Sequence, residues 1–369
     1  MDVGLSAEQL SLRDAVRDIL RTECPPDAVH DALDDTLNDA QTDPERWRTL
    51  WKTVVDLGWT ELAAPDSDDY GPAELVVVLE QCGAAIAPIP LLSSVGLAAG
   101  ALRGIATKGG LDSVLTDIAG GAVATLAAHA SGSRLPGAPM ELRNGRVRGR
   151  AVAVPNLSRA ELVVTLARSD AGGVLAAVVR CGEGVTVLPV ADSTDPTQPI
   201  ADVEVDAEPL AVAPLAGVEA ALTAPLLACA ADLVGVASAA LRRSVEHAKS
   251  RNQFGKPIGA FQGIKHALAD NYVSLERARS LTYAAAGQLS DPATTSADAW
   301  TAAALAKAAA GDAAADCART AVQVHGAIGQ TWEHDAHLYV RHAWQGAAML
   351  GDSRALYHEV GRRFCGGAA

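Results

Sequence analysis

A short segment in the last third of the chain combines charged, amide and aromatic side chains with glycines. It reads RNQFGKPIGAFQ over residues 251–262. A guanidinium such as that of Arg251 is planar and can give two charge-assisted hydrogen bonds to a diphosphate. Gln253 adds neutral hydrogen-bond donors, and Phe254 adds an apolar face. The segment therefore predicts a binding loop for a ligand that has a flat part and an anionic part.

A second segment, AVQVHGAIG over residues 321–329, carries a glutamine and two glycines. Gly326 and Gly329 leave room for the backbone to approach a flat or charged ligand. Gln323 can give and accept hydrogen bonds at the edge of an adenine or a ribose. A structural interpretation stays open for both segments, in which Arg251 only caps a helix and the glycines only shape a turn.

Together the two segments resemble the C-terminal signatures of the acyl-CoA dehydrogenase family. The first signature, RxxFGxxIxxFQ followed by Ala-Asp, is similar to residues 251–262 with Ala269 and Asp270. The second, QxxGGxG followed by Glu and Arg, is similar to residues 323–329 with Glu333 and Arg341. The resemblance extends more weakly over most of the chain and is specific in the C-terminal third.

In this family, residues at these positions hold the diphosphate and adenine of FAD and reach across a dimer interface to the neighbouring subunit's flavin. The resemblance therefore implies FAD as the cofactor. It also implies a cofactor-binding role for Arg251, Gln253, Phe254, Gln262, Gln323 and Gly326. One departure is Ala327, which stands where the family has the second of two glycines, so the closest approach to the ligand is less open here.

The reaction of the family needs a carboxylate base, because a proton leaves the α-carbon of an acyl-CoA thioester while the flavin accepts the β-hydride. Family members carry this glutamate at one of two places, and the matching positions here are Leu350 and Pro225. Neither side chain can accept a proton, so no catalytic residue is assigned. Asp352 and Glu219 lie near these positions but off the family's register, and Glu246 lies five residues before Arg251. All three stay open as replacements.

The middle of the chain also departs from the family. In family members, a Thr- and Ser-rich strand and a Trp-Ile-Thr-Asn strand surround the flavin ring and the thioester. The matching stretches here, residues 125–133 and 151–158, have lost most of the hydroxyl and indole groups. His129 is a candidate ligand group, although a lone histidine in an apolar strand is more often structural. By this comparison the chain is poorly equipped to hold a flavin ring.

The lost residues belong to the half of the site that holds the base and the flavin ring. The half that remains binds the diphosphate and adenine, and in the family it contacts the FAD of the neighbouring subunit. We therefore expect a heteromer in which a homologous subunit supplies the glutamate, the flavin-ring pocket and the acyl pocket. The pattern resembles the base-lacking subunit of actinobacterial heteromeric acyl-CoA dehydrogenases. These enzymes are heterotetramers, and several of them act on steroid side-chain CoA esters. Two alternatives stay open: a scaffold subunit without flavin, and a homomeric enzyme with relocated chemistry at Asp352 or His358.

The elements that must position these residues begin with helices. Residues 1–117 are expected to form an N-terminal helical domain. Ser6 followed by Gln9 predicts a capping box at the first helix. A second helix is expected from about Asp43 to a stop at Gly58.

A β-region and a second helical region are expected to follow. Residues 118–212 are short runs rich in Val and Leu with turn signals between them, which predicts a middle β-barrel or sandwich. Asn144-Gly145 between two such runs predicts a hairpin. Residues 213–369 return to long helices, with Ser296 as one cap, and predict a C-terminal four-helix bundle. The expected fold class is α+β, the acyl-CoA dehydrogenase fold that the resemblance implies.

Composition narrows the class of protein. Of the 369 residues, 49% are hydrophobic, which indicates a globular chain. The formal net charge of -14 offers no basic field to nucleic acid or to an anionic membrane. The six cysteines have no metal-ligand spacing, and no signal peptide or uninterrupted apolar stretch of about 18 residues stands out. We therefore expect reduced thiols, no metal, no membrane span and a cytoplasmic location.

Overall fold

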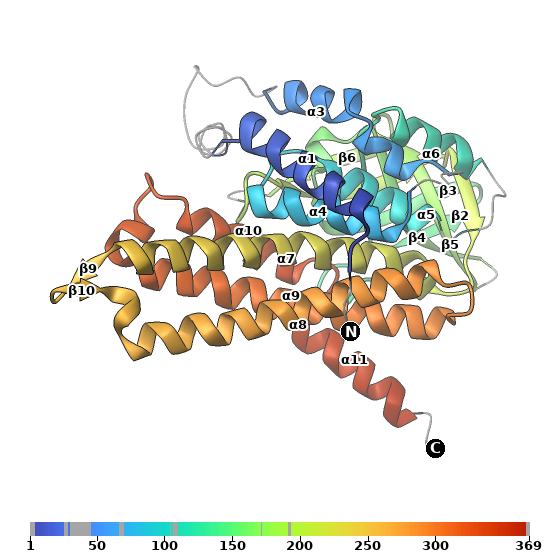
Figure 1. The fold of residues 1–369 in the computed structure, drawn as a ribbon. Coiled ribbons are helices and arrows are strands. Elements are labelled where there is room, and N and C mark those ends of the chain that lie inside the picture. The colour runs from blue at the N-terminus through green and yellow to red at the C-terminus, as the bar shows by residue number, and fades with distance from the viewer. Residues whose placement is uncertain are drawn as a thin grey trace.

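The computed structural model describes residues 4–25, 29, 46–65, 70–103, 105, 110–170, 172–190 and 193–366. Helices come first, then a β-sheet, then long helices, which confirms the predicted α+β class. Figure 1 shows the N-terminal helices and the sheet lying along one side of the long C-terminal helices. The expected start of the second helix, near Asp43, falls outside the described residues.

The N-terminal region consists of helices that turn apolar faces inward. The predicted capping box is present: the Gln9 amide donates to Ser6 Oγ at 3.1 Å, and the Ser6 amide donates to Gln9 Oε1 at 2.9 Å. The second helix ends just before Gly58, whose φ of 75° confirms the predicted stop. The elements are α1 (Ala7–Glu23), α3 (Arg46–Asp56), a 3-10 helix (Trp59–Ala63), α4 (Pro72–Ala85), a π-helix (Leu92–Ala99), α5 (Gly100–Arg103) and α6 (Leu111–Ala119).

The middle region is one eight-stranded sheet with the order β6-β7-β3-β2-β4-β5-β8, and β1 pairs with β4. Asn144 and Gly145 join β2 to β3 with φ values of 51° and 75°, which confirms the predicted hairpin. Side chains alternate along β4: Val164 belongs to the core shared with the helices, and Val163 to a separate cluster on the other face. The strands are β1 (Ala124–Ala127), β2 (Met140–Arg143), β3 (Arg146–Pro155), β4 (Leu162–Ser169), β5 (Val174–Arg180), β6 (Val185–Pro189), β7 (Ile200–Ala207) and β8 (Ala211–Pro214).

Long, alanine-rich helices form the C-terminal region and pack closely. Where α4 crosses α7 the backbones touch, because a Cβ on Gly235 would lie 1.9 Å from the Glu80 carbonyl oxygen. By composition α7 is long and apolar enough to cross a membrane, but 89% of its most apolar window is buried inside the protein, as in a core helix. The helices are α7 (Val218–Ser250), α8 (Gln262–Ser290), α9 (Ser296–His325), α10 (Ala336–Ala348) and α11 (Ser353–Gly366).

Two details of this region were predicted wrongly. The cap of α9 is Thr295, whose hydroxyl accepts a hydrogen bond from the Asp298 amide at 3.2 Å, and Ser296 is already the first helical residue. The region was also expected to hold four helices, but its described residues form five α-helices, because the last stretch is broken into α10 and α11. The break lies at Leu350 and Gly351, whose φ values of 55° and 104° are incompatible with a right-handed helix.

Candidate functional site

The first predicted binding segment is a hairpin that projects from one end of the bundle (Figure 1). Arg251 is the C-cap of α7, after which β9 (Asn252–Gln253) pairs antiparallel with β10 (Lys256–Pro257). Phe254 and Gly255 form the turn with φ values of 53° and 77°, both positive as in a type I′ turn. The Phe254 side chain is 91% exposed, so this apolar face is presented outward in the single chain.

The second segment gives its two glycines different roles. Gly326 has a φ of 69°, and a Cβ there would meet nothing within 4 Å, so this glycine leaves an open surface. A Cβ on Gly329 would lie 3.0 Å from the Cβ of His325, so this glycine serves internal packing. Gln323 is exposed on the last turn of α9. The open approach that the binding interpretation requires is therefore available at Gly326 and not at Gly329.

Tertiary packing places the two segments at the same edge of the molecule. His247 lies one helical turn before Arg251, and His325 directly precedes Gly326. The rings of these two histidines are in contact, with centroids 4.2 Å apart. The ends of α7 and α9 therefore meet, and the residues assigned to one ligand are presented together.

This edge fits an anionic ligand such as the diphosphate of FAD. Arg251 is exposed, and within the part of the chain that the structure describes, no carboxylate pairs with its guanidinium. Two other arginines of α7 are already paired: Arg243 Nη1 lies 2.8 Å from Asp335 Oδ2, and Arg242 Nη1 lies 3.7 Å from Glu246 Oε1. An exposed, unpaired guanidinium can give its donors to an incoming phosphate without first breaking an ion pair. Gln253 and Gln262 add exposed amides nearby in the chain.

The two positions where the family carries its base are closed in this chain. Pro225 is buried within α7, and a Cβ on Gly100 would lie 3.4 Å from its Cδ atom. Leu350 is 3% exposed and has a left-handed backbone. Two surface cavities of about 950 and 560 Å³ have other linings, and neither includes Pro225 or Leu350. Neither position therefore offers a proton acceptor or lines either of these cavities.

The three carboxylates considered as replacement bases have structural partners. Asp352 Oδ2 lies 2.6 Å from Arg134 Nη2, and Asp352 Oδ1 accepts a hydrogen bond from the Ala355 amide at 2.8 Å, which caps α11. Burial works against ionisation, but these hydrogen bonds hold the pKa of Asp352 below its ordinary value. Glu219 lies 2.8 Å from Arg363, and the Glu246 pairing with Arg242 is given above. These contacts favour structural roles for all three.

A buried lysine that the sequence analysis did not single out lies beside the Leu350 turn. Lys307 on α9 is fully buried, and its Nζ donates to the carbonyl oxygens of Ala347 at 2.5 Å and Gly351 at 2.7 Å. Burial lowers the pKa of Lys307 to about 8. The lysine thereby ties α9 to the break between α10 and α11. The available signal was a single lysine inside an otherwise alanine-rich stretch.

Polar side chains at the start of the sheet serve internal contacts. Thr125 is fully buried, and its Oγ1 donates to the Pro155 carbonyl oxygen at 2.5 Å. His129 follows β1, and its Nε2 is buried without a hydrogen-bond partner among the described residues. Burial, together with the charge of Lys307, lowers the pKa of His129. Thr125 is therefore engaged within the protein, and the His129 ring lies in a site that favours its neutral form.

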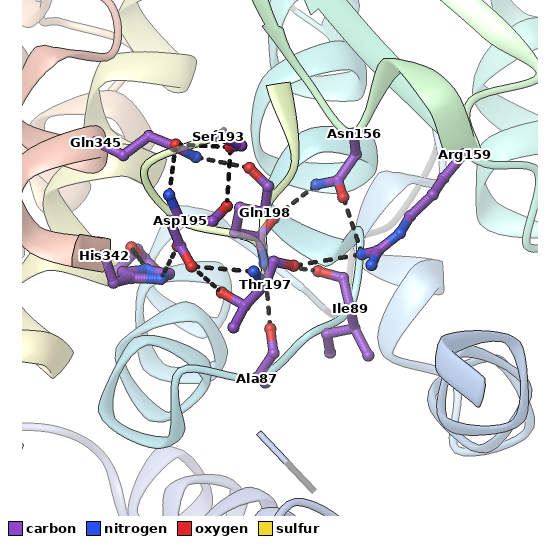
Figure 2. A network of polar contacts seen from close by, with 11 residues as sticks. Ala87, Ile89, Asn156, Arg159, Ser193, Asp195, Thr197, Gln198, His342 and Gln345 are labelled. Carbon is purple, nitrogen blue, oxygen red and sulfur yellow. Dashed lines mark hydrogen bonds and ion pairs between the residues drawn. The ribbon is translucent and has the colours of Figure 1, made fainter. Parts of the chain in front are cut away.

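A buried polar network, also missed from sequence, joins the sheet to the helices (Figure 2). His342 Nδ1 lies 2.7 Å from Asp195 Oδ2, and His342 Nε2 lies 2.9 Å from Asp232 Oδ2. Burial opposes the charge, but the carboxylates of Asp232 and Asp195 raise the pKa of His342 well above its ordinary value. Gln345 Nε2 donates to the Gln198 carbonyl oxygen at 2.6 Å in the same network. The loop between β6 and β7 is thereby fixed against α7 and α10.

Metal and disulfide chemistry have no visible basis in the described residues. No group of three or more His, Cys, Asp or Glu side chains in that part of the chain is arranged to hold a metal ion. All six cysteines are free thiols: Cys24, Cys82, Cys181, Cys229, Cys317 and Cys365. The assigned chemistry therefore rests on the exposed edge around Arg251 and Gly326.

Comparison with known proteins agrees with this fold. The family model described as acyl-CoA dehydrogenase, C-terminal domain, matches residues 218–364. The acyl-CoA dehydrogenase IpdE2 of Mycobacterium tuberculosis is 31% identical over 317 residues, which cover 85% of each chain. The ChsE4–ChsE5 complex from Mycobacterium tuberculosis contains a chain with a TM-score of 0.82 and 26% identity, and a variant of the Tcur3481–Tcur3483 steroid ACAD gives 0.85 and 25%. Both alignments cover 99% of each chain.

This chain therefore belongs to the acyl-CoA dehydrogenase family. The family is one of oxidoreductases, and FAD is its cofactor. Membership thus agrees with the cofactor that the resemblance of the two C-terminal segments implied. Which residues of this chain contact FAD stays a prediction.

Proposed function

We propose that this chain is the base-lacking subunit of a heteromeric acyl-CoA dehydrogenase. In this assembly Arg251, Gln253, Phe254, Gln262, Gln323 and Gly326 bind the diphosphate and adenine of an FAD whose flavin ring lies in a homologous subunit. That subunit supplies the catalytic glutamate and the acyl pocket. When bound, FAD supplies the hydride acceptor for α,β-dehydrogenation of the acyl-CoA thioester.

The observation that carries the proposal is the contrast between the two halves of the site. The edge around Arg251 is exposed, unpaired by any described carboxylate and open at Gly326. The positions of the base hold Pro225 and Leu350, which are buried and cannot ionise. An edge that presents hydrogen-bond donors outward but lacks the base can form a complete site only together with a second subunit.

The comparisons support the class of reaction and of partner. The similar solved proteins are described as a ChsE4–ChsE5 complex and as a steroid ACAD. By this similarity we propose a homologous subunit as the partner, in a heterotetramer that is inactive without it. We propose an acyl-CoA with a bulky or steroid side-chain acyl group as the substrate, and a cytoplasmic location. Neither nucleic acid nor a membrane is a partner in this proposal, since the net charge is -14.

Flavin content tests whether FAD binding requires both this chain and the homologous subunit. The chain is expressed alone and together with a glutamate-bearing homologue, and FAD is measured per chain in each purified sample. We expect a chain alone that is poor in FAD, and a complex with about half the FAD per chain of a homomer in which every subunit has its own site. A chain that purifies alone with one FAD and is reduced by an acyl-CoA would falsify the proposal.

Substitution of Arg251 in that complex tests the diphosphate clamp, the name used for the proposed FAD-binding edge around Arg251 and Gly326. Loss of charge-assisted hydrogen bonds of about 1.5–3 kcal/mol predicts that Arg251→Ala raises the Kd for FAD roughly 10- to 100-fold. Arg242→Ala is the matched control, because Arg242 is another exposed guanidinium on α7 and lies 3.7 Å from Glu246. Equal FAD affinity in the two variants removes Arg251 from the site.

A further inference from the structure

Three histidine rings lie in contact in a row (the stack) at the edge that presents Arg251 and Gly326, with successive rings tilted by 35° and 52°. His325 lies in the middle, with its ring centroid 4.2 Å from that of His247 and 4.4 Å from that of His334. His247 comes from the last turn of α7, His325 from the end of α9, and His334 from the turn before α10. Three separate elements thus bring titratable rings into contact.

Hydrogen bonds fix the neutral forms of two of these rings. His325 Nδ1 lies 2.7 Å from the Ala321 carbonyl oxygen, so this nitrogen carries a hydrogen and donates. His334 Nδ1 accepts a hydrogen bond from the Ala336 amide at 3.1 Å, so the hydrogen of the neutral ring is on Nε2. In the neutral His325 ring, Nε2 is therefore the nitrogen without a hydrogen. A second proton on His334 would break the bond that it accepts at the start of α10.

The charged groups around the stack are mainly cationic. Arg251 acts on His247 from the end of α7, and Arg243 acts on His334 from earlier in α7. At the start of α10, His337 and Asp335 also act on His334, but Asp335 Oδ2 lies 2.8 Å from Arg243 Nη1. The carboxylate that faces the stack is therefore already engaged with a guanidinium.

Without a ligand, these surroundings favour the neutral forms of His247 and His334. Burial, and then the neighbouring His325, lower the pKa of His247 and the pKa of His334. Two imidazolium charges about 4 Å apart repel each other by about 4 kcal/mol at an effective dielectric constant of 20. Once one ring of the stack is charged, a second proton is therefore strongly disfavoured.

We propose that the His247–His325–His334 stack is a proton-binding part of the diphosphate clamp, so that an anionic diphosphate binds together with a proton. This inference rests on the proposed function, because it takes the diphosphate to lie at Arg251 and Gly326. His247 is one turn from Arg251 and His325 adjoins Gly326, so a diphosphate at that edge lies next to the stack. Its two negative charges stabilise an imidazolium that the neighbouring cations otherwise disfavour.

The sign of the coupling follows from reciprocal linkage. An anion that raises the proton affinity of the stack is bound more tightly when the stack is protonated. FAD affinity therefore falls as pH rises through the range where histidines titrate, about pH 6 to 8. The diphosphate keeps both charges over this range, so the proton is taken up by the protein and not by the ligand.

Calorimetry of FAD binding to the FAD-stripped complex measures this proton directly. Titrations at neutral pH in buffers with different ionisation enthalpies give the number of protons taken up. We expect net uptake of up to about one proton, and a roughly 3- to 10-fold weaker affinity at about pH 8 than at about pH 6. In His325→Gln the uptake and the pH dependence are expected to disappear. His358→Gln is the matched control, since His358 is exposed on α11 and outside the stack.

The outcomes separate this inference from the proposed function. If Arg251→Ala weakens FAD binding while the unsubstituted complex takes up no proton, the stack is a packing feature and the inference fails alone. The same conclusion follows if His325→Gln keeps the full proton uptake. If Arg251→Ala leaves the affinity unchanged, the proposed position of the diphosphate fails and the inference fails with it. His247→Gln and the conservative His325→Asn repeat the measurement should His325→Gln not fold.

Discussion

The imidazole of His342 lies between two buried carboxylates, with Nδ1 2.7 Å from Asp195 Oδ2 and Nε2 2.9 Å from Asp232 Oδ2. The carboxylates come from the loop after β6 and from α7, and the histidine comes from α10. The three side chains are almost completely buried, with 4%, 2% and 4% exposure for His342, Asp195 and Asp232. A charged histidine thus joins the sheet to the bundle that carries Arg251.

Substitution of His342 is expected to lower the free energy of unfolding. His342→Gln leaves two buried carboxylates without a cation, and breaking a buried pair costs about 3–5 kcal/mol. Urea unfolding measures the loss. His358→Gln is the control, because an exposed substitution changes stability by less than about 0.5 kcal/mol. Equal unfolding free energies for the two variants would contradict a charged role for His342.

The same contact predicts a pH dependence on the alkaline side. The pKa of His342 is raised in the folded chain despite burial, because Asp232 and Asp195 face it. Its contribution is therefore fully present below the unfolded value of about 6.5 and is lost as pH rises through the folded pKa. The difference in unfolding free energy between the unsubstituted protein and His342→Gln should shrink at alkaline pH. A difference that stays constant up to high pH would refute the pairing.

The same contact also predicts a pH dependence on the acid side, where stability is lost as the pH falls. Burial works against the charge of Asp195, but the neighbouring His342 lowers the pKa of that carboxyl. Its contribution is present above the unfolded value of about 3.9 and is lost as pH falls through the folded pKa. Asp195→Asn should therefore remove the part of the acid unfolding transition that belongs to this group. Unfolding midpoints measured at a series of acid pH values test this.

Two glycines in helices are expected to respond in opposite ways to alanine. A Cβ on Gly235 would lie 1.9 Å from the Glu80 carbonyl oxygen, so Gly235→Ala must push α4 from α7 and costs about 1–3 kcal/mol or more. A Cβ on Gly287, in α8, would meet nothing within 4 Å. Gly287→Ala should therefore stabilise the chain by about 0.5–1 kcal/mol. Denaturant midpoints with unchanged slopes distinguish the two effects, and destabilisation by both variants would contradict the close crossing.

Asp352 is expected to matter for stability and not for turnover. Its carboxylate caps α11 through the Ala355 amide at 2.8 Å and pairs with Arg134 at 2.6 Å. Asp352→Asn keeps a capping oxygen and removes the charge, whereas Asp352→Ala removes the cap and costs about 1 kcal/mol. Turnover and FAD content of the complex should be unchanged in both. A loss of turnover that is much larger than the loss of folded protein would restore Asp352 as a candidate base.

The local features of the fold were predictable from sequence, and the long-range ones were not. The Ser6–Gln9 capping box and the Asn144-Gly145 hairpin are decided by residues within three positions of one another, and both were found. The cap at Thr295 was missed by one position, because adjacent Thr and Ser are both good caps. The break between α10 and α11 was missed although Asp352 caps α11 locally, and its contacts with Lys307 come from far away on α9.

The sequence by itself determined which chemistry the chain carries. The motifs around Arg251 and Gly326 identified the family, and Leu350 and Pro225 cannot act as bases in any conformation, because ionisation is a property of the side chain. Only the tertiary structure decided which groups meet: that the two motifs share one edge, that the rings of His247, His325 and His334 are in contact there, and that Asp352 is paired. The reason is physical, since a residue's proton affinity and availability depend on neighbours that packing brings from distant parts of the chain.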